Sequence, residues 1–198
     1  MNLMTKEHIA KIIRVLSVPP IMVSMFILIL AFNKSDIFRN PTEIIIMIVL
    51  LGFVPALAYV LSSIIPEVKT KGREGQRKLA FITNLLGYSM ALLWAIMTNV
   101  RKELLLICLM YFLSVVLLSI CNKGFHFRAS GHASSFTGPL ILMIYFFGWK
   151  VIIPSLIIAA LIVWSSIYLK RHTIKELAGG ILVNIIAFIL SVIIVTVL

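Results

Sequence analysis

Long apolar runs alternate with short basic or polar stretches along almost the whole chain. A helix needs about 20 apolar residues to cross the hydrocarbon core of a bilayer. Seven runs approach this length with few fixed charges, which predicts an all-α, polytopic transmembrane helical bundle. The runs are 12–32, 43–65, 79–98, 104–121, 133–149, 151–169 and 177–198.

The first and fifth runs deviate from this pattern. The first carries Arg14 near its start and follows a basic stretch, but no small-residue cleavage site follows it, so we expect an uncleaved span. The fifth is short and begins with Ser, Thr and Gly residues, which favours a start inside a protein-lined cavity. We therefore expect six to seven spans.

Composition supports a single integral membrane domain over residues 1–198. Hydrophobic residues make up 61% of the chain and the mean hydropathy is +1.11, whereas soluble domains are about 45–50% apolar. The two cysteines, Cys108 and Cys121, lie at or inside apolar runs. Their number and placement argue against a disulfide framework and against a thiolate metal site.

Basic residues are distributed unevenly between the two ends of the predicted bundle. With seven crossings, the N-terminus and the loops at 66–78, 122–132 and 170–176 share one side, which carries thirteen of the 18 Lys and Arg residues. The positive-inside rule places this side, with the N-terminus, in the cytoplasm. If six of these cations bind substrate instead, seven still remain against five on the opposite side.

Three of the four histidines, His126, His132 and His172, fall on this same basic side. A net charge of +11 is also compatible with simple binding of anionic lipid headgroups, which is the ordinary interpretation of the surface lysines. A helical bundle by itself does not require histidines to gather beside the densest cations. We therefore expect chemistry at the histidine loops.

The first of these loops lies in KGFHFRASGHASSFTGP, residues 123–139. Small residues around Ser130 and Gly131 permit a tight turn with exposed backbone N–H groups before a helix start, a natural anion cradle. Lys123 and Arg128 add positive charge, and His132 is placed to deliver a proton to a leaving oxygen. The alternative is an interfacial loop whose basic residues contact phospholipid.

The second lies in SSIYLKRHTIKELAGG, residues 165–180. His172 and Glu176 are four residues apart, so on a helix they share one face. A carboxylate there holds the proton on one imidazole nitrogen and leaves the other nitrogen free as a nucleophile. The alternative is an exposed helix start with an ordinary ion pair.

Together the two segments resemble the second and third motifs, P-S-G-H and S-R-x5-H-x3-D, of the type-2 phosphatidic acid phosphatase superfamily of membrane lipid phosphatases. The chain has Ala-Ser-Gly-His ending at His132 and Ser-Ser-x5-His-x3-Glu ending at Glu176. The resemblance implies that His172 attacks phosphorus, that Glu176 orients it, and that His132 protonates the leaving group. The implied motif-bearing core is approximately 66–198.

The chain departs from the family pattern at several positions. Ala129 replaces proline, Ser166 replaces the motif arginine, the acid is Glu176 in place of Asp, and no K-x6-R-P first motif is present. Losing an arginine removes a bidentate phosphate clamp, and other cations on the same side are candidates to replace it. The expected substrate-binding residues are Arg73, Arg77, Lys123, Arg128, Ser130, Gly131 and Arg171.

Phosphoryl transfer needs positioning and charge stabilisation, which cations and N–H groups supply without metal. The basic side lacks the clustered aspartates that magnesium-dependent transferases use, so we expect no metal or other cofactor and activity that survives EDTA. Expected partners are the bilayer and a membrane lipid phosphate or prenyl diphosphate, not nucleic acid. A catalytically inactive relative that binds or transports lipid phosphate is the alternative from another functional class.

Overall fold

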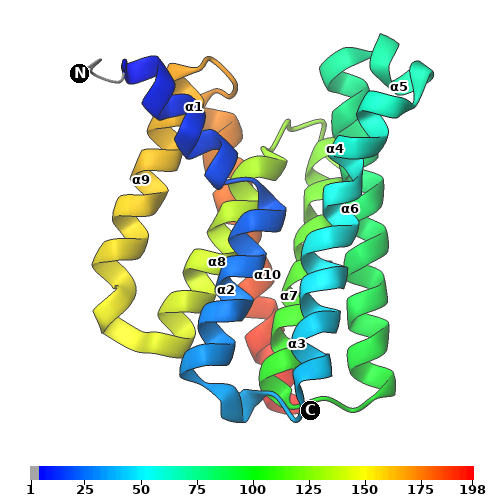
Figure 1. Cartoon of the computed structure of the whole chain (residues 1–198), viewed down its shortest axis with the longest axis vertical. Coiled ribbons are helices and arrows are strands. Elements are labelled where there is room, and N and C mark those ends of the chain that lie inside the picture. The colour runs from blue at the N-terminus through cyan, green and yellow to red at the C-terminus, as the bar shows by residue number, and fades with distance from the viewer. Residues whose placement is uncertain (1–4) are drawn as a thin grey trace.

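The computed structural model describes residues 5–198, and every regular element within that range is a helix (Figure 1). Within residues 5–198, five helices are long and apolar enough to cross a membrane, or six if the bent pair at the N-terminal end is one span. The protein is therefore a helical integral membrane protein. The elements are α1 (Lys6–Leu16), α2 (Pro19–Asn33), η1 (Ser35–Ile37), α3 (Pro41–Ile48), η2 (Val49–Phe53), α4 (Val54–Ile64), α5 (Pro66–Thr70), α6 (Gly72–Met97), α7 (Lys102–Ser119), η3 (Ile120–Gly124), α8 (Gly131–Phe147), η4 (Gly148–Val151), α9 (Ile152–Tyr168) and α10 (Ile174–Val197).

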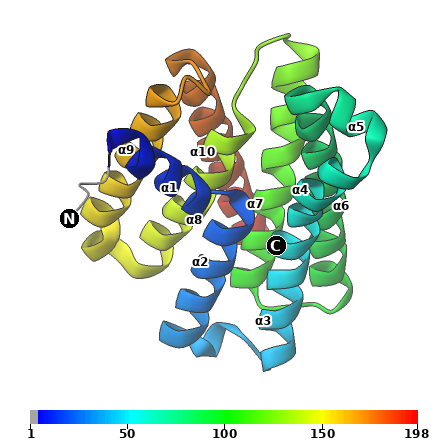
Figure 2. The same ribbon diagram turned by 45° about the horizontal axis from the view of Figure 1, so that its top comes forward.

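The first apolar run, predicted as one span over 12–32, is broken. Helix α1 ends at Leu16, and α2 starts at Pro19 with an axis bent by 63° from that of α1. Val18 has an extended backbone because the residue before a proline avoids the helical region, and Pro19 fits the first turn of α2. As a result α1 crosses the upper end of the bundle and packs on α9 (Figures 1 and 2).

The long helical segment Gly131–Tyr168 folds back on itself at η4. Gly148 has a positive φ of 72°, which a residue without a Cβ adopts most easily. The two arms, α8 and α9, contact each other and run in opposite directions (Figure 1). These arms correspond to the separate runs at 133–149 and 151–169 expected from the sequence.

Helix α10 packs along α7 and α8 at the centre of the bundle. Asn184 of α10 donates hydrogen bonds from Nδ2 to Ser114 Oγ of α7 at 2.9 Å and to Ser134 Oγ of α8 at 3.3 Å. All three side chains are buried, where polar groups require partners. Asn184 therefore joins α10 to α7 and α8, and α8 and α10 begin at the two histidine segments.

The basic segments gather at one end of the molecule, the upper end in Figure 1. Helix α1, α5, the connection between η3 and α8, and the connection between α9 and α10 all lie there, which agrees with the grouping of loops inferred from the sequence. The opposite end holds η1, η4 and the connection between α6 and α7.

We expect Asn184→Leu to destabilise the bundle by about 1 kcal/mol, because interhelical hydrogen bonds in membranes are worth roughly 0.6–2 kcal/mol. The measurement is thermal unfolding in detergent. Asn84→Leu is the matched control, since the half-buried Asn84 has no side-chain hydrogen bond to any part of the chain that the structure describes. Equal unfolding midpoints for the two variants would contradict the stabilising role of the Asn184 hydrogen bonds.

Candidate active site

The two histidine segments meet because the first turns of α8 and α10 are in direct contact. The backbone N–H of Ser130 donates to the Glu176 carbonyl oxygen at 2.8 Å. Gly180 lies against the same place: a Cβ on it would overlap the Ser130 carbonyl oxygen and come within 2.8 Å of the Ala133 Cβ. The absence of a side chain at Gly180 thus permits the close approach.

Ser130 serves as the N-cap of α8. Its Oγ accepts a hydrogen bond from the Ala133 N–H at 3.2 Å, a common way to satisfy the first N–H groups of a helix. The cradle expected here is therefore partly occupied by the chain itself, because the Ser130 N–H and Oγ are both engaged. The N–H groups of Gly131 and His132 have no hydrogen-bond partner within residues 5–198 and remain as donors.

His172 precedes α10, and Glu176 in the first turn of that helix holds its ring. The Nδ1 atom of His172 lies 3.4 Å from Glu176 Oε2, and both side chains are largely buried. Glu176 is itself fixed by a capping box, in which the Thr173 N–H donates to Oε2 at 3.0 Å and Thr173 Oγ1 accepts from the Glu176 N–H at 3.2 Å. A proton on Nδ1 that points at this carboxylate leaves the lone pair of Nε2 free.

His132, in the first turn of α8, faces this imidazole. The ring centroids of His132 and His172 are 6.4 Å apart and the ring planes differ by 7°. The rings are therefore nearly parallel neighbours contributed by two different helices. The Nε2 atom of His132 lies 3.3 Å from Ser17 Oγ, at the break between α1 and α2.

Arginines surround the two imidazoles. Arg128 Nε pairs with Glu176 Oε1 at 3.2 Å, while its side chain is 69% exposed. Arg77 of α6 interacts electrostatically with Arg128 and with Arg73, and Arg171 directly precedes His172. These four predicted cations belong to one cluster.

Lys123 does not join this cluster through any direct contact. Its Nζ lies 5.3 Å from the centre of the Phe81 ring, a cation–π contact with α6. His126 is exposed, with a positive φ of 54°. The sequence placed both residues on the basic side but gave no information on where their side chains point.

Arg14 is a member of the cluster that the sequence did not identify as a site residue. It is one of the two positive charges that lower the pKa of His172, and it interacts electrostatically with His132 as well. A signal was present in the sequence: Ala10, Arg14 and Ser17 are spaced four and three residues apart and so share one face of a helix. Only the bend after Leu16 directs that face toward the histidines.

The pKa of His172 is lowered from the usual 6.5. Burial is the largest cause, because it disfavours the charged ring, and the positive charges of Arg14 and Arg77 act in the same direction. Glu176 opposes these effects and raises the pKa. The net result favours the neutral imidazole near pH 7, the form in which Nε2 is nucleophilic.

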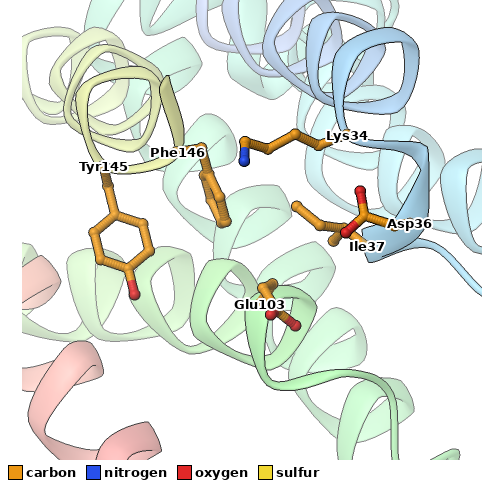
Figure 3. A pocket seen from close by; sticks show the side chains of 6 residues that line it. All are labelled: Lys34, Asp36, Ile37, Glu103, Tyr145 and Phe146. Atoms are coloured by element: carbon orange, nitrogen blue, oxygen red, sulfur yellow. The ribbon is translucent and has the colours of Figure 1, made fainter. Parts of the chain in front are cut away.

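Apart from this cluster, the structure contains a notable cavity. A cavity of about 280 Å³ lies at the opposite end of the molecule, lined by Lys34, Asp36, Ile37, Glu103, Tyr145 and Phe146 (Figure 3). Across residues 5–198 no group of three His, Cys, Asp or Glu side chains is placed to hold a metal ion.

We expect Gly180→Ala to separate the first turns of α8 and α10, because the added Cβ would overlap Ser130. Overpacking of this kind costs about 1–3 kcal/mol. The readouts are the unfolding midpoint, which should fall, and the rate of diethylpyrocarbonate modification of His172, which should rise. Gly124→Ala is the control, since its Cβ would meet only Ile120 Cγ2 at 3.8 Å; similar behaviour of both variants would contradict the close-approach argument.

Comparison of the chain with protein-family models, with curated proteins and with solved structures found no match.

Proposed function

We propose that the protein is a membrane lipid phosphatase that hydrolyses a phosphate or diphosphate from an amphiphilic substrate through a phosphohistidine, without metal. The observation that carries the proposal is the paired arrangement of His172 and His132. One imidazole is oriented by Glu176 at 3.4 Å, and the other faces it at a ring separation of 6.4 Å. Binding of an anion alone needs cations and does not need an oriented nucleophile.

In the first step, Nε2 of His172 forms a bond to phosphorus while the bond from phosphorus to the leaving oxygen breaks. His132, in its imidazolium form, donates one proton to that oxygen and becomes neutral, and Glu176 stabilises the positive charge on the His172 ring. In the second step, neutral His132 accepts a proton from water, whose oxygen attacks phosphorus and releases phosphate from His172. The guanidinium groups and the N–H groups of Gly131 and His132 would stabilise charge on the phosphoryl oxygens.

The location of the site supports an amphiphilic substrate. The histidine cluster lies at one end of a helical bundle that spans the membrane, so a phosphate held there leaves an attached lipid tail at the level of the bilayer. Polyprenyl diphosphate and phosphatidate both have this form. With α8 and α9 as separate crossings the chain would have seven spans, and the excess of cations at the site end supports a cytoplasmic site and N-terminus.

The second candidate is an inactive lipid-phosphate binder or transporter. Ser166, which replaces the arginine of the related motif, is fully buried and its Oγ has no partner within the described residues. A site without that arginine retains enough positive charge to bind phosphate. The two candidates differ in whether His172 is needed for turnover.

Replacing His172 by Ala should lower turnover by at least about 10³-fold, because it removes the nucleophile, while phosphate binding persists. His132→Ala should cost about 10²–10⁴-fold, the usual contribution of a general acid. The assay is phosphate release from polyprenyl diphosphate and from phosphatidate by purified protein in EDTA. The exposed His126 provides the control variant, His126→Ala, which should retain activity. Equal rates in all four proteins would favour the binder.

The acidic limb of kcat/KM should lie below pH 6.5, because the pKa of His172 is lowered and the neutral ring persists to lower pH. Activity should therefore be lost only as pH falls through this lowered value. Glu176→Gln removes the charge that raises the pKa, so the limb should move further toward acid while the maximal rate falls. An acidic limb above pH 6.5 in the wild type would argue against His172 as the titrating group.

A further inference from the structure

Helix α1 has two different faces. Ala10 is fully buried and Ser17 is 2% exposed, and Arg14 lies between them on the face turned toward the bundle. On the other side, Ile12, Val15 and Leu16 are 46%, 61% and 55% exposed. An amphipathic helix with an apolar outer face is typical of a segment that lies in the membrane interface. The inner face, with Ala10, Arg14 and Ser17, therefore contacts the protein at the level of the lipid headgroups.

The guanidinium of Arg14 has an unsatisfied polar atom. Its Nη1 is buried and has no hydrogen-bond partner among the residues that the structure describes. The acid on the same helix, Glu7, pairs with Lys11 at 2.7 Å. The nearest charges that act on Arg14 include Arg171 and Arg73, which repel it.

A buried guanidinium nitrogen without a hydrogen-bond partner is costly, and nearby like charges increase that cost. An anion in the same space removes both penalties, since its oxygens accept hydrogen bonds from the fork of N–H groups and offset the positive charge. Arg14 lies one helical turn before Ser17, whose Oγ is 3.3 Å from His132 Nε2, and the His132 and His172 ring centroids are 6.4 Å apart, so an anion bound by Arg14 would lie near the two imidazoles.

Ser17, one turn beyond Arg14, connects the same helix to the site. Its Oγ lies 3.2 Å from the Arg14 carbonyl oxygen, to which it donates, and 3.3 Å from His132 Nε2. A hydroxyl that donates to the carbonyl has only its lone pairs left for the ring, so Nε2 carries the proton in this arrangement. The C-terminal end of α1 thus contacts one histidine and positions a guanidinium close to both.

We propose that Arg14 is the clamp for the phosphoryl oxygens of the ligand, and that α1 is the part of the active site that lies against the lipid. The ligand class is a phosphate monoester, or the terminal phosphate of a diphosphate, carried by a membrane amphiphile. The proposal deepens the function proposed above and rests on it for turnover, whereas the binding of phosphate by Arg14 is independent of turnover.

The test uses the full-length protein in detergent with Arg14→Gln, Arg14→Lys and the control Lys11→Gln, which removes an exposed cation from the same helix. The probes are inorganic phosphate and phosphatidate in mixed micelles, with Kd measured by calorimetry. Arg14→Gln should weaken binding about 10- to 100-fold, as expected for lost charge-assisted hydrogen bonds. Arg14→Lys should be intermediate, because it keeps the charge but not the planar fork, and Lys11→Gln should stay within about twofold.

The unfolding midpoint separates a binding role from a structural one. Without phosphate, Arg14→Gln should unfold at the same temperature as the wild type or higher, because an unpaired buried charge has been removed. The rise in midpoint that phosphate gives the wild type should be lost in this variant. Tighter binding of phosphatidate than of inorganic phosphate would support the lipid as the source of the ligand.

The proposal is overturned if Arg14→Gln binds both probes as tightly as the wild type, or if the wild type binds neither. A lower unfolding midpoint with unchanged binding would also overturn it, since Arg14 would then act only in packing. Failure of the phosphatase proposal has a different signature. In that case, turnover is absent or independent of His172 while the loss of binding in Arg14→Gln remains.

Discussion

The contact between the first turns of α8 and α10 is the constraint on which the site depends. A single backbone hydrogen bond, from the Ser130 N–H to the Glu176 carbonyl, links them at 2.8 Å. Gly180 makes that distance possible because any side chain there would overlap the Ser130 carbonyl. With the two helices fixed in this way, the imidazoles of His132 and His172 face each other as a consequence of packing. Deeper in the bundle, Asn184 bonds to α7 and α8 and holds the same helices together.

Glu176 performs three tasks with one carboxylate. It caps α10 through Thr173, orients His172 through Nδ1 and pairs with Arg128. Each contact restricts the position of the carboxylate, and the carboxylate in turn restricts the orientation of the His172 ring.

The break at Val18 changes what the N-terminal segment does. A straight helix over 12–32 would carry Arg14 along the outside of the bundle as the entry of a span. The 63° bend instead lays α1 across the site and turns Arg14 and Ser17 inward. The physical cause is local: the two prolines and the extended residue before them. The consequence is that Ser17 contacts His132 and Arg14 acts electrostatically on both histidines.

From the sequence we predicted the helical membrane class, the end at which the cations gather and the proximity of His172 and Glu176. The class and the gathering of cations follow from apolar run length and loop order, which are local properties. The contact between His172 and Glu176 was predicted for a shared helical face, but it forms across the N-cap of α10, because His172 precedes the helix. The tertiary structure alone decided that His132 and His172 meet, that Lys123 contacts Phe81, that the Ser130 N–H is already bonded, and that Arg14 belongs to the cluster. Each of these features depends on the rotation and the distance between helices that are far apart in sequence. Glycine contacts and the bends between elements set this packing. The periodicity of a single segment does not contain that information.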